Sequence, residues 1–154
     1  MTHAETIVQE ASTTESVLRW TARVVLSTVL LSAALGKLSD PSLFLGFVSA
    51  VFGIGASGAN ALFIFTVCLE VLLGGAVLLI VKQPWAYWSS ACLFLLFAAI
   101  ISYAIVIDME ASCGCFGAFL ETQEANPVSL IRNVFLAATA LFLAIDLSNH
   151  PSDD

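Results

Sequence analysis

Two cysteines one residue apart, in Cys113-Gly114-Cys115-Phe116-Gly117, are the residues of this sequence best suited to chemistry. A bridge between residues i and i+2 closes too small a loop to stabilise the fold through chain entropy, and its geometry is strained. Gly114 relieves part of that strain because glycine has wide backbone freedom. Strained, exposed disulfides are labile or catalytic. The pair therefore predicts an exchangeable dithiol facing an oxidising compartment, with free thiols or a static bridge as the alternative.

A metal site at this pair is a weaker interpretation, because two thiolates supply only half of a tetrahedral site. The histidines, His3 and His150, are both expected on the other side of the membrane. The nearby acidic residues Asp108, Glu110 and Glu121 are poor partners for a soft thiolate site. We therefore expect no metal bound by this chain alone, and a site shared with a second protein stays open.

The elements that position the cysteines are predicted to be membrane-spanning helices. The chain of 154 residues is 59% hydrophobic and 11% charged, with a mean hydropathy of +0.96, whereas a soluble domain carries about a quarter charged residues. A helix needs about 20 apolar residues to cross the hydrocarbon core. The segments that meet this requirement are 17–36, 59–81, 85–107 and 128–147.

We therefore expect an all-α integral membrane protein, a four-helix bundle over residues 17–147. A loose polar tail over 1–16 and an acidic tail over 148–154 flank it. A cleavable signal peptide around Arg19 and Arg23 is disfavoured, because a long acidic segment precedes these arginines. The net charge of −7 excludes a nucleic-acid-binding function, since phosphate contacts need clustered Lys and Arg.

The few cations give a prediction of topology. Arg19, Arg23 and Lys82 fall on one side of the expected bundle, and Lys37 and Arg132 fall on the other, at span ends where long side chains reach outward. The excess on the first side places both termini in the cytoplasm. The cysteine loop is then extracytoplasmic, in a multi-pass protein of the plasma membrane.

Two further features concern the membrane interfaces. Trp85, Tyr87 and Trp88 are predicted to form an aromatic belt on the cytoplasmic side. On the outer side, Asp40-Pro41 begins a mostly apolar segment over 42–53 that is too short to span. This segment predicts a re-entrant or interfacial helix close to the cysteine loop.

Glu70 lies about halfway along the second predicted span, where a charge costs at least about 2.5–3.5 kcal/mol. Its candidate partners are Arg132 and Lys37, and counting depth from the span ends favours Arg132. One interpretation is an ion pair that locks two helices together. The other is a functional role as a proton carrier or as a hydrogen-bond partner of a quinone, since dithiol oxidation releases protons.

Cys68 and Cys92 lie within the second and third predicted spans. In apolar surroundings a free cysteine behaves as a small, inert hydrophobe, and this is the expected role of both. An electron relay through them is the alternative.

Small residues mark the expected helix contacts. Thr28, Ser32 and Gly36 form a stripe of small residues on the first span. Gly74-Gly75 on the second span would let another helix approach equally closely. We interpret both as packing features, with a gate or a ligand cleft at this point as the alternative.

Several motifs together resemble the MauE family of methylamine-utilisation proteins, within the wider group of DoxX-like membrane proteins. They are Ala34-Leu35-Gly36-Lys37-Leu38-Ser39-Asp40-Pro41, Cys68-Leu69-Glu70, the loop Cys113-Gly114-Cys115-Phe116-Gly117 and Leu130-Ile131-Arg132-Asn133. The similarity covers nearly the whole chain apart from its tails, and the cysteine loop with Arg-Asn downstream is its most specific part.

The resemblance implies a four-helix protein of the bacterial inner membrane whose cysteine loop lies on the periplasmic or outer face. Family members are linked to the maturation of exported, disulfide-rich proteins and to a separate thioredoxin-like partner. Cys113 and Cys115 would be the redox pair. The supporting residues implied in this way are Lys37, Glu70, Arg132 and Asn133, beside Gly114, Phe116 and Gly117 of the loop.

The predicted function is thiol–disulfide exchange between an extracytoplasmic thioredoxin-like partner and the membrane, with a membrane quinone as the expected electron acceptor. The chain lacks the second outer cysteine pair that other four-helix disulfide enzymes use, which leaves its status as an oxidoreductase open. One alternative is a non-enzymatic scaffold for assembly of an exported or membrane complex. Another is a proton-coupled carrier centred on Glu70, which the lack of inverted repeats disfavours.

Overall fold

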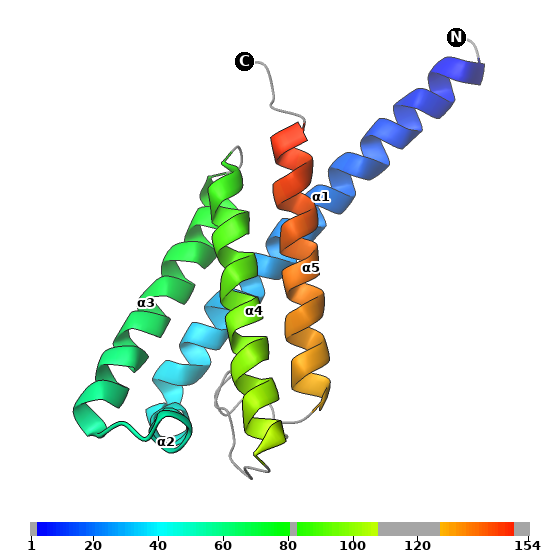
Figure 1. Ribbon diagram of the computed structural model, residues 1–154. Helices are drawn as coiled ribbons and strands as arrows, with labels where there is room; N and C mark the ends of the chain where they lie inside the picture. The colour runs from blue at the N-terminus through cyan, green and yellow to red at the C-terminus, as the bar shows by residue number, and fades with distance from the viewer. Residues whose placement is uncertain (1–2, 81–82, 108–126, 150–154) are drawn as a thin grey trace.

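The computed structural model describes residues 3–80, 83–107 and 127–149, with side chains from residue 17 onward, and these ranges are almost entirely helical (Figure 1). The helices are α1 (His3–Ser39), α2 (Pro41–Phe52), α3 (Ala56–Leu79), α4 (Pro84–Val106) and α5 (Pro127–Asn149). The part Val17–Ser39 of α1, together with α3, α4 and α5, is long and apolar enough to cross a membrane. The predicted four-helix membrane protein is confirmed, with span ends within about one helical turn of those expected.

The first helix begins earlier than the hydropathy pattern suggests. Residues 3–16, for which the sequence predicts a loose tail, continue α1 as regular helix. The segment contains no Gly or Pro to break a helix, and a helix already formed in the span extends at little cost. Polarity therefore marks the end of the membrane span without ending the helix.

The short helix predicted after the first span is confirmed as α2 (Pro41–Phe52). Asp40 caps it by accepting a hydrogen bond from the backbone N–H of Ser42 at 3.1 Å. Pro41 occupies the first turn, where a missing N–H costs nothing. Gly53 ends the helix with φ of 62°, a left-handed conformation that favours glycine. These local rules fix α2 between α1 and α3.

The helices form two closely packed pairs, α1 with α3 and α4 with α5. The start of α1 and the end of α5 lie at one end of the bundle, together with the end of α3 and the start of α4, and we call this the terminal end (Figure 1). α2 lies across the other end, where α4 ends and α5 begins. α1 runs obliquely behind the other helices. α3 and α4 are neighbours in sequence, yet they lie close together only where α3 ends and α4 begins, and they diverge toward the end where α2 lies (Figure 1).

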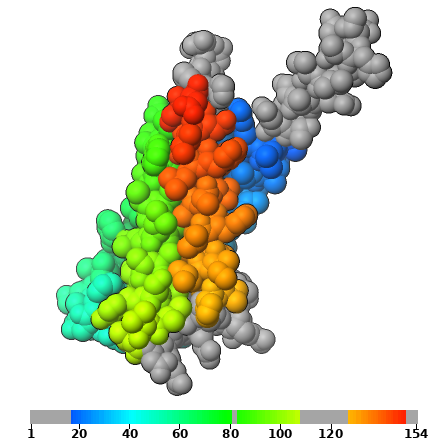
Figure 2. Space-filling model, turned by 45° about the vertical axis from the view of Figure 1, so that its right-hand side comes forward, coloured from blue at the N-terminus to red at the C-terminus, as the bar shows by residue number. Residues whose placement is uncertain are grey.

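The contact between α4 and α5 is built from small side chains. Figure 2 shows the two helices touching along most of their length. Ala91 and Ala104 on α4 and Ala137, Ala140 and Ala144 on α5 are all at most 1% exposed. Small residues let helix backbones approach closely, which is the main source of helix association in lipid.

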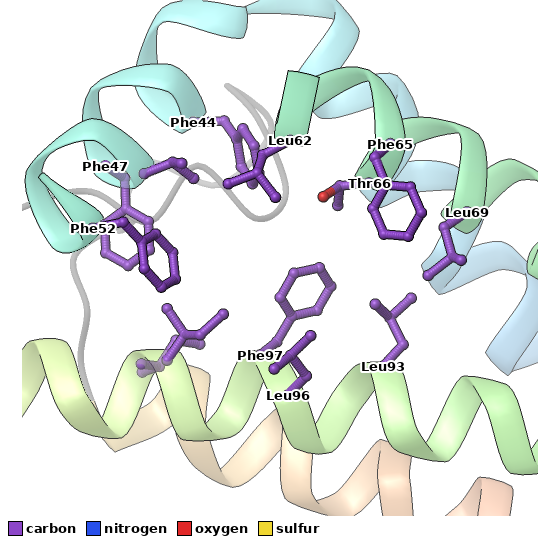
Figure 3. A pocket seen from close by; sticks show the side chains of 13 residues that line it. Phe44, Phe47, Phe52, Leu62, Phe65, Thr66, Leu69, Leu93, Leu96 and Phe97 are labelled. Carbon is purple, nitrogen blue, oxygen red and sulfur yellow. The ribbon is translucent and has the colours of Figure 1, made fainter. Parts of the chain in front are cut away.

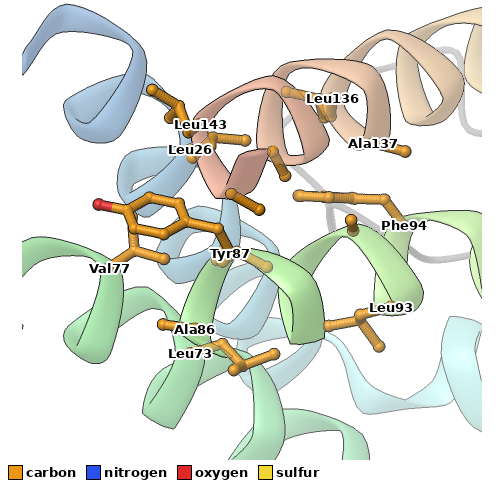
Figure 4. Close-up of a cluster of buried hydrophobic side chains, with 14 of the residues drawn as sticks. Leu26, Leu73, Val77, Ala86, Tyr87, Leu93, Phe94, Leu136, Ala137 and Leu143 are labelled. Carbon is orange, nitrogen blue, oxygen red and sulfur yellow. The ribbon is translucent and has the colours of Figure 1, made fainter. Parts of the chain in front are cut away.

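Larger side chains fill the space between the pairs at the terminal end of the bundle (Figure 4). This cluster joins Leu26 of α1, Val77 of α3, Tyr87 of α4 and Leu143 of α5, all fully buried. The predicted aromatic belt is therefore wrong for Tyr87, although Trp85 and Trp88 are 48% and 44% exposed. Position near a span end does not decide whether a side chain faces lipid or the bundle.

The α1–α3 contact depends on Gly74. A Cβ at this position would lie 3.0 Å from Leu31 Cγ and 3.3 Å from Leu30 Cβ, and Ser27 Oγ donates to the Gly74 carbonyl at 2.8 Å. The predicted small-residue contact is confirmed at Gly74. On α1 the predicted stripe is wrong only at Thr28, which is exposed, whereas Ser32 is half-buried and Gly36 is buried.

Candidate functional site

The predicted redox pair lies outside the described residues. This applies to Cys113 and Cys115 and to the loop residues Gly114, Phe116 and Gly117. The helices on either side are described, and α4 ends and α5 begins at the same end of the bundle as α2 (Figure 1). The candidate site therefore has to be built from the helices at this end.

A buried ion pair joins α1 to α3. Lys37 Nζ donates to Glu70 Oε1 over 2.7 Å, and the two side chains are 0% and 1% exposed. A single charge at this depth is costly, and pairing with a hydrogen bond is the usual condition under which buried charges are tolerated. The other carboxylate oxygen, Glu70 Oε2, is buried and has no hydrogen-bond partner in the part of the chain that the structure describes.

The preference for Arg132 as the partner of Glu70 is wrong, as is the expectation that Lys37 reaches outward. Residues 30–31 of α1 lie beside Gly74, and α1 and α3 run in opposite directions (Figure 1). Glu70 precedes Gly74 by about one turn, or about 6 Å, and so lies level with the last turns of α1. Depth counting failed because the first span continues to Ser39 and crosses α3 obliquely, which places Lys37 inside the span and beside Glu70.

Two aromatic rings surround the Lys37 ammonium. Its Nζ lies 5.6 Å from the ring centroid of Phe44 on α2 and 5.4 Å from that of Phe97 on α4. Both distances are within the range of cation–π attraction, which is stronger at desolvated sites. The ion pair and its surroundings are therefore assembled from α1, α2, α3 and α4.

The other predicted supporting residues are not part of this ion pair. Asn133 on α5 is 2% exposed, and its Nδ2 donates to the Ser129 carbonyl of its own helix at 2.8 Å. Arg132, next to it, is partly buried. The structure thus brings together Lys37 and Glu70, and it does not bring Asn133 to them.

Cys68 and Cys92 are exposed on the outer surfaces of α3 and α4. In a bilayer these surfaces face lipid. The electron-relay alternative therefore gains no support, because neither thiol points into the bundle. Within the described ranges, no group of three or more His, Cys, Asp and Glu residues could hold a metal ion.

A cavity of about 200 Å³ lies where α2, α3 and α4 meet (Figure 3). Its lining is apolar except for Thr66, and it includes Phe44 and Phe97, the two rings that contact Lys37. The complete lining is Phe44, Phe47, Val48, Phe52, Leu62, Phe65, Thr66, Leu69, Leu93, Leu96, Phe97, Ile100 and Ile101. The candidate site is therefore an ion pair with an apolar cavity directly beside it.

The family model of methylamine utilisation protein MauE matches residues 15–146. This range contains both partners of the ion pair and almost all of the four candidate spans. The chain belongs to the MauE family. Membership confirms the resemblance inferred from the motifs and agrees with a multi-pass membrane protein. No curated protein and no solved structure matches this MauE-family chain.

Sequence reasoning missed two features of this MauE-family protein. Arg19 on α1 pairs with Asp146 on α5, with Nε 2.9 Å from Oδ2, at the terminal end of the bundle. An acidic residue near the end of the fourth span was the available signal. The cavity was also missed, because its lining comes from three helices whose relative tilt the sequence pattern does not encode.

Proposed function

We propose that this protein is a membrane thiol–disulfide exchange protein that works through Cys113 and Cys115. The observation that carries the proposal is the C-G-C-F-G loop at 113–117, in the segment between α4 and α5. A C-x-C pair has little value as a structural staple, and as a strained disulfide it is readily exchanged. Membership of the MauE family supports this function.

The proposed partner is an extracytoplasmic thioredoxin-like protein. A thiolate of the partner attacks one sulfur of the Cys113–Cys115 disulfide, and the other sulfur leaves as a thiolate. The second thiol of the partner then breaks the mixed disulfide. The partner ends oxidised, this protein ends with two thiols, and the oxidised partner can pass its disulfide to an exported client protein.

The proposed orientation places the cysteine loop outside the plasma membrane and both termini in the cytoplasm. Three cations, Arg19, Arg23 and Lys82, fall on the side of the bundle where the first span begins, and two fall on the other side. Because cytoplasmic loops are richer in Arg and Lys, this excess supports a cytoplasmic position for both termini. This orientation also puts the thiols in a compartment where disulfides persist. The opposite orientation would expose them to the reducing cytosol.

Labelling in native membranes tests both the chemistry and the orientation. Cys68→Ser and Cys92→Ser serve as background, so that a membrane-impermeant maleimide reports only on Cys113 and Cys115. We expect labelling of intact cells only after treatment with dithiothreitol. Cys115→Ser should trap a mixed disulfide with a thioredoxin-like protein, which mass spectrometry would identify.

Two results would contradict the proposal. One is labelling of both loop thiols without reductant, since that would mean no exchangeable disulfide. The other is labelling only after the cells are opened, since that would place the loop in the cytoplasm. Full function of a Cys113→Ser, Cys115→Ser variant would instead favour the non-enzymatic scaffold.

A further inference from the structure

The cavity between α2, α3 and α4 opens toward the bilayer and closes toward the buried ion pair. On its outer side, Phe65 and Leu96 are 62% and 56% exposed. On its inner side, Phe44 is 5% exposed, and both Phe44 and Phe97 contact the Lys37 ammonium. A molecule dissolved in lipid can therefore enter between α3 and α4 without passing through water.

The size of the cavity suits one substituted ring. Its volume is about 200 Å³, whereas an apolar cavity of about 150 Å³ already binds benzene and pockets for drug-sized ligands start at about 300 Å³. A ring with small substituents fits inside. Any longer tail has to leave through the opening between α3 and α4, where it meets lipid.

Thr66 gives this apolar cavity a single polar group. It is 8% exposed, and its hydroxyl points into the cavity (Figure 3). Thr21 and Thr139 satisfy their hydroxyls by donating to the carbonyl one turn earlier, at 2.8 and 2.9 Å. Thr66 makes no such bond to any residue that the structure describes. Because a hydroxyl at a cavity wall can donate a hydrogen bond into the cavity, this group favours a ligand that carries an acceptor.

The aromatic lining favours an electron-poor ring over an alkyl chain. The faces of Phe44 and Phe97 carry negative partial charge. A ring with electron-withdrawing carbonyl groups stacks well on such faces, and one carbonyl can accept the hydrogen bond of Thr66. An acyl chain would fill the same volume but would leave the hydroxyl without a partner.

We propose that this cavity binds the ring of a membrane quinone, with Thr66 donating to a ring carbonyl and the tail leaving between α3 and α4. The inference rests on the proposed thiol–disulfide function. Oxidising the Cys113–Cys115 dithiol breaks two S–H bonds, forms one S–S bond and releases two electrons and two protons. The quinone takes up two of each and becomes the quinol, with two new O–H bonds.

Photolabelling tests the binding directly. The full chain is placed in nanodiscs made of quinone-free lipid and labelled with a photoreactive azido-ubiquinone analogue, and the labelled peptides are identified by mass spectrometry. We expect label on the cavity-lining parts of α2, α3 and α4. Decylubiquinone should compete for labelling, whereas decylbenzene, which has a ring and a tail but no carbonyl, should compete much less.

Matched variants locate the entrance and the hydrogen bond. Leu96→Trp should block the opening and remove most of the labelling, whereas Leu95→Trp, on an exposed position beside the opening, should leave it unchanged. Thr66→Val keeps the shape of the side chain and removes its hydroxyl. It should weaken competition by decylubiquinone about fivefold, the usual effect of one neutral hydrogen bond, and Thr28→Val on the exposed face of α1 is its control.

Equal competition by decylbenzene and decylubiquinone would overturn the inference, because it would show an apolar cavity without recognition of carbonyls. Labelling that is unaffected by Leu96→Trp would overturn it as well. The measurement is repeated in a Cys113→Ser, Cys115→Ser variant, where quinone binding should persist. Quinone binding is thus measured without any electron transfer. A negative result for the thiol–disulfide function would therefore not count against the quinone site, and a negative result here would not count against the thiol–disulfide function.

Discussion

The two sides of α4 differ in how closely a neighbouring helix approaches. Toward α5, alanine side chains at Ala91, Ala137 and Ala140 let the helices pack tightly. Toward α3, leucine, phenylalanine and isoleucine side chains hold the helices apart and leave a cavity. We call these the α4–α5 seam and the α3–α4 cleft. Both are apolar, so side-chain size and not hydrophobicity distinguishes them.

This difference follows from the solvent. In water, burial of apolar surface would draw α3 and α4 together wherever they are apolar. In a bilayer the lipid is as apolar as the side chains, and association depends on close packing and on polar contacts. The seam is held by packing. In the cleft, large side chains keep α3 and α4 apart. α2 closes one end of the cleft, and the Lys37–Glu70 pair lies on its inner side.

The largest expected effect is on the ion pair behind the cleft. Lys37→Met leaves Glu70 buried without its partner and should lower the free energy of unfolding by about 3–5 kcal/mol. Lys37→Met combined with Glu70→Leu should cost clearly less, because no charge is left uncompensated. Unfolding in mixed micelles with increasing dodecyl sulfate measures both. If the double variant loses as much stability as Lys37→Met and Glu70→Leu lose when measured separately and added, the two side chains do not stabilise each other.

Added volume should separate the seam from the cleft. Ala140→Leu forces the α4–α5 backbones apart and should cost about 2 kcal/mol or more. Leu69→Phe adds volume on the wall of the cavity, where there is room, and should change stability by less than about 0.5 kcal/mol. The same unfolding measurement compares the two variants. Equal losses would mean that the cleft is packed as tightly as the seam.

Two adjacent glycines test close approach on the other helix pair. A Cβ on Gly74 would meet Leu31 and Leu30, whereas one on Gly75 would meet nothing within 4 Å. Gly74→Ala should therefore destabilise by about 1 kcal/mol, and Gly75→Ala should be neutral or stabilising by up to about 1 kcal/mol. The midpoint of thermal unfolding in nanodiscs shows which of the two variants is less stable. If both variants behave alike, α1 does not approach α3 at Gly74.

Of the two ion pairs, the one at the terminal end of the bundle should contribute much less to stability. The Arg19 and Asp146 side chains are 35% and 15% exposed, so water and lipid headgroups compensate either charge. Asp146→Asn should cost about 0.5 kcal/mol, in the usual range for accessible pairs. Unfolding at low and at high salt measures this cost, which should shrink at high salt because salt screens exposed charges. A loss as large as that of Lys37→Met would show that the bundle interior offers no special environment for charge.

Much of the fold was predictable because local physics determines it. Hydropathy located the four spans, and Asp40, Pro41 and Gly53 marked the limits of α2. A charge in mid-membrane predicted that Glu70 needs a partner. In each case one residue type or one short pattern was sufficient, since no knowledge of another helix was required.

The partner of Glu70 could not be predicted in this way. Lys37 reaches Glu70 because α1 crosses α3 obliquely, so that its last turns lie level with the middle of α3. The close approach of the two helices at Gly74, beside Leu30 and Leu31, fixes that level. The inward orientation of Tyr87 and the outward orientation of Cys68 and Cys92 have the same kind of cause. They depend on which face of each helix the neighbours cover.

The sequence by itself therefore determined that this is a four-span membrane protein of the MauE family, with a C-x-C motif between its last two spans and a carboxylate within the second. Only the tertiary structure decided which cation neutralises that carboxylate and that a cleft opens beside the pair. The physical reason is that hydropathy and turn residues act along the chain. Charge pairing and cavities depend on the angles at which helices cross.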